Sequence, residues 1–191
     1  MICFFSVEND FDLIIVGSGP AGLGAAFEVL LRAPKTSVLV VDRNEFSSGG
    51  LRNDCKMNFT WPIGFPEICW TKDQAETYLD RVEAFLSPRI LEKKNVDVYR
   101  KRAEKLGVSL LSIRQTHLGT DGGLELIKGL TLKLKALGAE LSLGEMMLDI
   151  DMERKTAITD RRELRYRNLV LAPGRGGFAF LQNIMNKAGI A

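Results

Sequence analysis

A buried strand that runs directly into a glycine-rich turn and a helix constrains this chain more than any other feature. Residues 13–16 are apolar and mostly β-branched, the pattern of a strand covered on both faces in a parallel sheet. The turn that follows has the spacing G-x-G-x-x-G and consists of Gly17, Ser18, Gly19, Pro20, Ala21 and Gly22. A helical segment then continues to Arg32, so these residues predict a strand–turn–helix unit.

Each glycine of this turn has a separate physical use. Gly17 permits the tight turn out of the strand, Gly19 lets a pyrophosphate approach the backbone, and Gly22 lets the helix pack close to the strand. A second buried strand is expected at residues 37–41, and Asp42 stands at its end, 20 residues after Gly22. Its carboxylate can accept both hydroxyl hydrogens of an adenosine ribose and would repel a 2′-phosphate. The pattern predicts an adenine-dinucleotide site, against the plainer interpretation of a chance glycine-rich turn.

The G-x-G-x-x-G pattern does not separate FAD from NAD, but two further features favour FAD. The pattern lies near the start of the sequence, and the chain later returns to a second strand that ends in glycine, at residues 169–174. Residues 12–26, DLIIVGSGPAGLGAA, resemble the opening of the glutathione-reductase-like FAD proteins. Residues 169–174, LVLAPG, are similar to the second motif of these proteins, with Pro173 in place of a threonine.

A narrower resemblance rests on residues 53–58, 116–121 and 172–177. These segments resemble the FAD-dependent, or NAD(FAD)-utilising, dehydrogenase family, although Cys55 stands where that family more often has glycine. The resemblance implies a FAD-dependent oxidoreductase, with NAD as a second nucleotide. Together with the glycine pattern, it assigns the cofactor to Gly17, Ser18, Gly19, Pro20, Ala21, Gly22, Asp42, Arg43, Gly50, Leu51, Met147, Ala172 and Gly174.

Length sets this chain apart from the family that it resembles. Family members are usually well over twice as long, and their later part supplies a strand and a Gly-Asp motif that hold the rest of FAD. Nothing after Gly177 supplies that motif here. We therefore expect a fragment, a truncated form, or a chain completed by another chain or by further copies of itself. The alternatives are a non-catalytic dinucleotide-binding module within a larger assembly and an NAD-binding dehydrogenase.

The expected fold is α/β: a Rossmann-like parallel sheet of the FAD/NAD(P)-binding type, with an antiparallel meander and an inserted helical segment. Residues 10–45 and 107–191 form the dinucleotide-binding domain in this interpretation, and residues 46–106 form the insert. Helices are expected at 72–86, 89–106, 122–137 and 178–187, further parallel strands at 140–143 and 169–172, and meander strands at 146–152, 155–159 and 163–167.

No residue earns a catalytic assignment from the sequence. His117 is the only histidine and could act as an acid or base near a flavin, but its segment could equally shape a turn. Asp121 is expected to cap the following helix rather than to act as a base. The basic residues between positions 89 and 105 alternate with acids, which favours a solvated helix face over a docking surface for an acidic partner or a nucleotide phosphate.

Composition narrows the remaining classes. Lys and Arg total 26 against 24 Asp and Glu, which gives no electrostatic case for a nucleic-acid or membrane partner. Three cysteines and one histidine do not make a standard metal site, so free thiols and a cytoplasmic location are expected, with substrate and electron donor unknown. Cys55 and Cys69 lie 14 positions apart, which does not match a flavin-linked redox pair. Trp61 and Trp70 are expected in a packed loop core or a lid.

Overall fold

A computed structural model describes residues 7–46 and 55–190 of this protein. The chain divides into two compact units, one made of Met1–Asn53 with Asp121–Ala191 and the other of Asp54–Thr120. The first unit contains β1 (Val7–Val16), α1 (Pro20–Arg32), β2 (Val38–Asp42), most of α4 (Gly119–Ala136), β5 (Glu140–Leu143), β6 (Met147–Asp151), β7 (Thr156–Thr159), β8 (Glu163–Leu171), η2 (Arg175–Gly177) and α5 (Phe178–Lys187).

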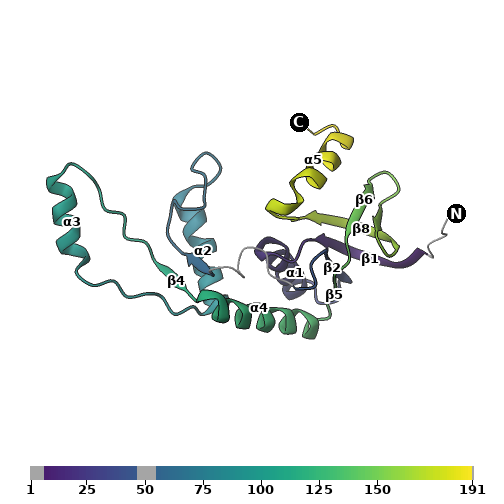
Figure 1. Cartoon of the computed structure of the whole chain (residues 1–191), viewed down its shortest axis with the longest axis horizontal. Coiled ribbons are helices and arrows are strands. Elements are labelled where there is room, and N and C mark those ends of the chain that lie inside the picture. The colour runs from purple at the N-terminus through teal and green to yellow at the C-terminus, as the bar shows by residue number, and fades with distance from the viewer. Residues whose placement is uncertain (1–6, 47–54, 191) are drawn as a thin grey trace. The chain divides into compact units, whose positions relative to one another are not determined.

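The first unit is built on one six-stranded sheet with the order β5-β2-β1-β8-β7-β6 (Figure 1). The four strands β5, β2, β1 and β8 run parallel, while β6 and β7 continue from β8 as an antiparallel meander. The register pairs Val16 with Val41 on one side and with Leu171 on the other. The carboxyl ends of β1, β2 and β8 therefore meet at one edge of the sheet, and the predicted α/β Rossmann-like fold is confirmed.

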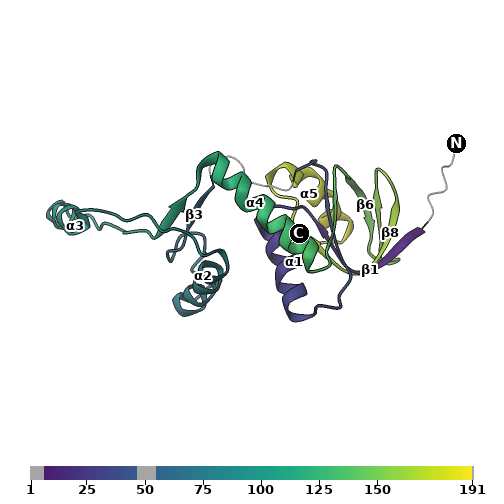
Figure 2. The same cartoon turned by 90° about the horizontal axis from the view of Figure 1, so that it is seen from below.

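Alternating side chains of the central strands fill two apolar layers. Ile14 and Val16 belong to a core cluster that also contains Ile184 of α5. Ile15 points the other way, because its Cγ2 lies 3.3 Å from where a Cβ on Gly22 of α1 would stand. Helix α1 thus covers one face of the sheet and α5 the opposite face (Figures 1 and 2). Burial on both faces explains why the central strands read as continuous apolar runs.

Strand β8 differs from the sequence prediction, which divided it into a meander strand at 163–167 and a parallel strand at 169–172. It is one strand, Glu163–Leu171, that pairs with β7 over its first part and with β1 along its length. The polar residues in its middle suggested a break, but they bind β1 instead. Arg167 forms a 3.0 Å ion pair with Asp12, and Asn168 donates a 3.1 Å hydrogen bond from Nδ2 to the Asp12 carbonyl.

The second unit contains β3 (Lys56–Asn58), α2 (Lys72–Leu86), α3 (Val96–Lys105) and β4 (Gln115–His117), and β3 pairs antiparallel with β4. Helix α2 has the predicted bounds and begins with a capping box between Thr71 and Gln74. The apolar residues of this helix are buried only in part. Ala75 and Leu79 are buried, whereas Tyr78 and Val82 remain 47% and 46% exposed.

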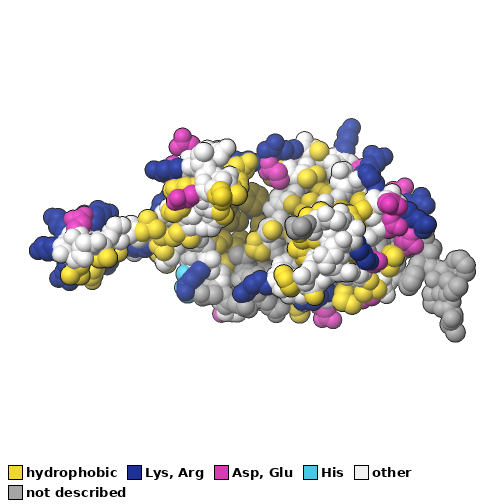
Figure 3. Space-filling model, turned by 90° about the horizontal axis from the view of Figure 1, so that it is seen from above, with side chains coloured by type: hydrophobic (Ala, Val, Ile, Leu, Met, Phe, Trp, Pro, Cys, Tyr) yellow, Lys and Arg dark blue, Asp and Glu magenta, His cyan; other side chains and the backbone are white. Residues whose placement is uncertain are grey.

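Helix α3 is shorter than the predicted helix over 89–106. The residues before it are not helical, and the Leu91 amide instead donates a 2.8 Å hydrogen bond to the Gln115 carbonyl of β4. None of the residues of α3 is buried, and basic side chains cover it (Figure 3). Arg100 is paired with Asp97 at 2.7 Å. Helix α3 therefore presents its basic side chains at the surface, which both a solvated face and a docking surface require.

Three smaller predictions concern loops and helix ends. The tryptophans form part of an aromatic series in which the rings of Trp61 and Phe65 lie 6.4 Å apart, Phe65 and Trp70 5.2 Å, and Trp70 and Tyr78 5.3 Å. The rings pack on one another as expected of a loop core, but both tryptophans are only half-buried. The prediction that Asp121 caps α4 is wrong, because α4 begins at Gly119 and places Asp121 inside the first turn. Cys55 and Cys69 are free thiols, the first buried and the second exposed. Across residues 7–46 and 55–190, no helix is long and apolar enough to cross a membrane.

Candidate nucleotide-binding site

The turn between β1 and α1 is held against the ends of the two neighbouring strands. The Gly17 amide donates a 2.8 Å hydrogen bond to the Val41 carbonyl, and the Ala172 amide donates one of 2.8 Å to the Val16 carbonyl. Gly17 has φ +102°, and a Cβ there would lie well under 3.0 Å from the Ala172 oxygen. Only glycine fits both this conformation and this approach, so the tight-turn role predicted for Gly17 has a structural basis.

Helix α1 begins with its first amides uncapped. Gly19 is the N-cap and makes no side-chain hydrogen bond, Pro20 opens the helix, and the first turn carries no acid. A Cβ on Gly22 would lie well under 3.0 Å from the Gly17 carbonyl oxygen, so α1 packs directly on the strand end. The first amides of a helix have no intrahelical acceptor, and the helix dipole adds partial positive charge there. This corner can therefore hold an anion between Gly19 and Gly22.

Asp42 lies at the end of β2, beside the glycine turn, and its carboxylate accepts four hydrogen bonds. Oδ2 accepts from the Ser18 amide at 2.8 Å and from the Ser18 hydroxyl at 2.6 Å. Oδ1 accepts from the amide and from Nδ2 of Asn44, both at 2.9 Å. Two of these four donors, the Ser18 hydroxyl and the side-chain Nδ2 of Asn44, sit on side chains that can rotate. A ribose diol can take their two places without moving the backbone, so the site fits the predicted ribose acceptor.

The loop after β8 completes the same edge of the sheet. Gly174 has φ +64° and ψ −169°, a combination that only glycine adopts readily, and the space beside its Cα is open. The Arg43 guanidinium, from the loop after β2, lies against Gly176. The structure therefore brings together the predicted residues Gly17–Gly22, Asp42, Arg43, Ala172 and Gly174. Gly50 and Leu51 lie outside the described residues.

The connection between β5 and β6 lies against residues 42–44, where β2 ends. The Gly144 amide donates a 2.9 Å hydrogen bond to the Asn44 carbonyl, and the Glu145 amide donates one of 3.0 Å to the Asp42 carbonyl. Met147, predicted to offer its backbone to adenine, begins β6 two residues later and pairs with Thr159. Its side chain is buried in the core cluster, which leaves only the backbone for such a role.

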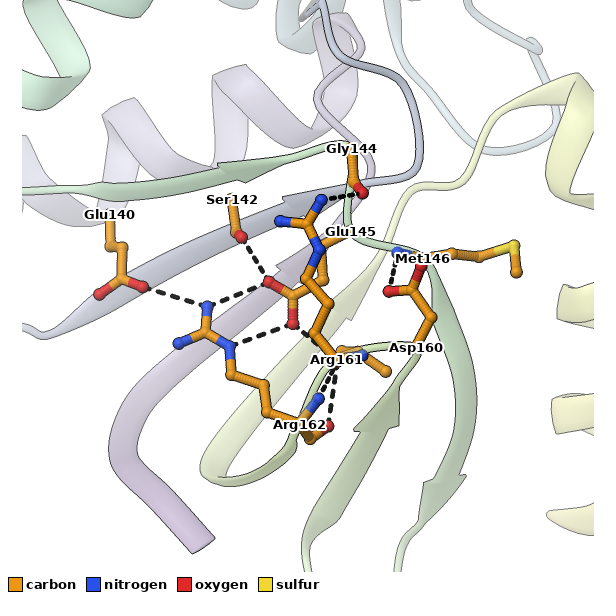
Figure 4. A network of polar contacts seen from close by, with 9 residues as sticks. Glu140, Ser142, Gly144, Glu145, Met146, Asp160, Arg161 and Arg162 are labelled. Atoms are coloured by element: carbon orange, nitrogen blue, oxygen red, sulfur yellow. Dashed lines mark hydrogen bonds and ion pairs between the residues drawn. The ribbon is translucent and has the colours of Figure 1, made fainter. Parts of the chain in front are cut away.

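A buried ion pair that the sequence did not predict anchors this connection (Figure 4). The Glu145 side chain is 1% exposed and accepts 3.1 Å hydrogen bonds from Nε and Nη2 of Arg162. It also accepts from the hydroxyls of Ser142 and Thr159. Burial by itself raises the pKa of Glu145, but the hydrogen bonds from Arg162, Ser142 and Thr159 outweigh it and leave that pKa lowered. The hydrogen bond to Glu145 raises the pKa of Arg162 in turn.

Other candidate residues belong to the second unit. His117 is an exposed residue of β4, paired with Lys56 of β3. Cys55 is buried and has φ +43°, a left-handed conformation that glycine adopts more readily than other residues. This agrees with the glycine that the dehydrogenase family named above more often has at this position. A cavity of about 570 Å³ is lined by Phe59, Thr60, Trp61, Lys72, Glu76, Leu79, Asp80 and Arg114, none of them a predicted nucleotide ligand. Within the part of the chain that is described, no group of three or more His, Cys, Asp or Glu side chains could hold a metal ion.

Comparison with known proteins supports the fold. No protein-family model and no curated protein matches the chain. Among solved structures, it is similar to NikD, an unusual amino acid oxidase essential for nikkomycin biosynthesis, with 19% identity and a TM-score of 0.57 over 94% of this chain and 54% of NikD. The glycine oxidase of Bacillus cereus has 14% identity and a TM-score of 0.58, over 93% of this chain and 58% of the oxidase. THI4 of Thermovibrio ammonificans has 15% identity and a TM-score of 0.59, over 94% of this chain and 62% of THI4.

The shared fold is the Rossmann-like FAD/NAD(P)-binding fold of flavoproteins. Identities of 14% to 19% carry the fold alone and leave the reaction open. The chain spans 54% to 62% of the length of these three neighbours.

Proposed function

We propose that this chain binds FAD at the corner between β1 and α1 and belongs to a FAD-dependent oxidoreductase, a dehydrogenase of the glutathione-reductase-like type. The observation that carries the proposal is the combination of Gly17 and Gly22, neither of which has room for a Cβ, with the uncapped start of α1 between them. Asp42 adds an acceptor for the ribose beside that anion site. Similarity to flavoproteins and oxidases in fold supports the proposal.

The residues of the corner divide the adenosine half of the cofactor between them. The amides of Gly19, Ala21 and Gly22 would hold the pyrophosphate, because Pro20 has no N–H to donate. Asp42 would accept the two ribose hydroxyls, and the loop from Ala172 to Gly174 would pass beneath the pyrophosphate. The bound flavin supplies hydride or electron transfer, whereas the protein binds and orients it.

The coverage of the neighbours favours a second candidate. Because the chain spans 54% to 62% of the neighbouring proteins, a dinucleotide-binding module that works only within a larger assembly also fits. An NAD-binding dehydrogenase would use the same glycines and the same acid. The two nucleotides are distinguished by titration of the purified chain with FAD and with NADH.

Flavin uptake tests the proposal. We expect the purified chain, incubated with FAD and freed of unbound nucleotide, to retain the visible absorbance bands of flavin. Asp42→Ala should weaken FAD affinity by more than about tenfold, since each charge-assisted hydrogen bond contributes roughly 1.5–3 kcal/mol. Asp12→Ala is the matched control: Asp12 also accepts from a serine, Ser37, but four residues before the end of β1.

Three outcomes separate the candidates. Flavin retention by the chain and by Asp12→Ala, with loss in Asp42→Ala, supports the FAD site. A chain that stays colourless with FAD but binds NADH indicates the NAD-binding alternative. A chain that binds neither nucleotide contradicts the proposal for this chain by itself and supports the module.

A further inference from the structure

The carboxylate of Asp42 depends on the loop that leaves β5, the strand beside β2, and leads to β6. The Glu145 amide binds the Asp42 carbonyl at 3.0 Å, and the Gly144 amide binds the Asn44 carbonyl at 2.9 Å. Asn44 in turn donates twice to Oδ1 of Asp42. Any shift of the β5–β6 connection therefore moves both the backbone of Asp42 and the donors that orient its carboxylate.

The turn between β7 and β8 holds this connection in place (Figure 4). Arg162 binds the buried Glu145 carboxylate through two nitrogens, and its Nη2 also reaches Glu140 at 3.2 Å. Arg161 donates to the Gly144 carbonyl, and Asp160 exchanges hydrogen bonds of 2.9 and 3.0 Å with the backbone of Met146. Three consecutive residues of one turn thus bind three consecutive residues of the loop that supports Asp42.

This network is more than a hairpin needs to close. The β7–β8 pairing already joins Ile158 to Glu163, and the Thr159 amide already binds the Arg162 carbonyl at 2.9 Å. The Glu145–Arg162 pair instead connects the turn to the parallel half of the sheet, at 1% exposure for Glu145 and 18% for Arg162. A buried pair of this kind fixes one arrangement, because an unpaired charge at such a depth is costly.

We propose that Glu145 and Arg162 are positioning residues for the ribose of the bound nucleotide. They hold the β5–β6 connection, and through it the Asp42 carboxylate, in the orientation that receives a 2′,3′-diol. This inference rests on the proposed nucleotide site and adds to it the residues that set its preference for a ribose over a deoxyribose. Sequence position gives no hint of it, since the two residues lie 17 positions apart.

The test compares the affinities of ADP and 2′-deoxy-ADP for the full chain by titration calorimetry. The wild-type protein should prefer ADP by about tenfold or more, because the deoxy compound lacks one charge-assisted hydrogen bond to Asp42. Glu145→Gln should weaken the binding of ADP more than that of 2′-deoxy-ADP, because ADP loses two hydrogen bonds to Asp42 and the deoxy compound only one, so that the preference falls below about threefold. If Glu145 had a purely structural role, the substitution would weaken the binding of both nucleotides alike and leave the ratio of their affinities unchanged.

Two further variants separate positioning from general destabilisation. The double variant Glu145→Gln with Arg162→Met leaves no unpaired buried charge, so it should regain thermal stability without regaining the preference for ADP. Ile184→Val removes a methylene from the core on α5 without breaking any hydrogen bond of the network, and should keep the wild-type preference.

The outcomes distinguish this inference from the proposed function. If the wild-type protein binds neither ADP nor FAD, both fail together. If it binds ADP but shows no preference over 2′-deoxy-ADP, or if Glu145→Gln and the double variant keep the wild-type preference, the nucleotide site stands and the positioning role is overturned.

Discussion

Two glycines of α1, two positions apart, make opposite predictions for the same substitution. Gly22 faces β1: a Cβ there would lie well under 3.0 Å from the Gly17 carbonyl oxygen and 3.3 Å from Ile15 Cγ2. Gly24 is exposed, and a Cβ there would meet nothing within 4 Å. Both residues lie inside the helix, so alanine improves the intrinsic helix propensity by up to about 1 kcal/mol at either position.

The structure decides the net sign at each position. Gly24→Ala should stabilise the protein by about 0.5–1 kcal/mol, since it adds helix propensity without a steric cost. At Gly22 the obstruction is a backbone carbonyl that cannot rotate away, so the helix must move, at an overpacking cost of up to about 3 kcal/mol. After the propensity gain, Gly22→Ala should destabilise the protein by about 2 kcal/mol. Gly22→Ala should also weaken the binding of FAD, because the amides that would face the pyrophosphate move with the helix.

Thermal unfolding followed by far-ultraviolet circular dichroism measures both variants. For a chain of this size, about 2–4 °C of Tm corresponds to each kcal/mol, so Gly22→Ala should melt roughly 4–8 °C lower and Gly24→Ala roughly 1–4 °C higher than the wild-type protein. If Gly22→Ala were as stable as Gly24→Ala, the close approach of α1 to β1 would be wrong, and with it the geometry of the anion site.

Three further predictions concern other parts of the molecule. Gly174→Ala should cost about 1–3 kcal/mol of stability, because φ +64° with ψ −169° is strained for any residue with a Cβ; a Tm equal to the wild-type value would contradict that backbone conformation. The lowered pKa of Glu145 predicts a stabilisation that is complete above its ordinary value of 4.5 and is lost as the pH falls through the lower native pKa, with Arg162 and Glu140 the charged groups beside it. In urea unfolding, the free energy of unfolding of Glu145→Gln should then lie closest to that of the wild-type protein in acid. If the two proteins differed by the same free energy at every pH, the stabilising role of the ion pair would be refuted. Thr71→Ala should cost the second unit about 1 kcal/mol through loss of the cap on α2, and an unchanged urea midpoint for that unit would argue against the capping box.

The nucleotide corner could be predicted from the sequence because its determinants are local. The spacing of Gly17, Gly19 and Gly22 between an apolar run and a helix leaves few other structures open, and Asp42 follows from the end of the next apolar run. The bounds of α2 and α5 were also predicted, because helical periodicity and terminal signals agree there.

The features that were missed depend on contacts between distant segments. The sequence predicted two strands in place of β8 because Arg167 and Asn168 interrupt its apolar pattern, and pairing with β1 gives both side chains partners. The Glu145–Arg162 pair forms only once the β7–β8 turn reaches the end of β5. A glutamate in an otherwise apolar stretch, 17 positions before an arginine, carries no local signal of burial.

The central claim is that the diphosphate of an adenine nucleotide binds the free amides at the start of α1. Amide chemical shifts of the ¹⁵N-labelled chain, recorded during titration with ADP, test it most directly. We predict that the largest saturable shifts belong to Gly19, Ala21 and Gly22, with smaller ones at Ser18 and Asn44. Saturable binding that leaves these amides unmoved and instead shifts Thr60, Trp61 and Arg114, which line the cavity of the second unit, would contradict the claim.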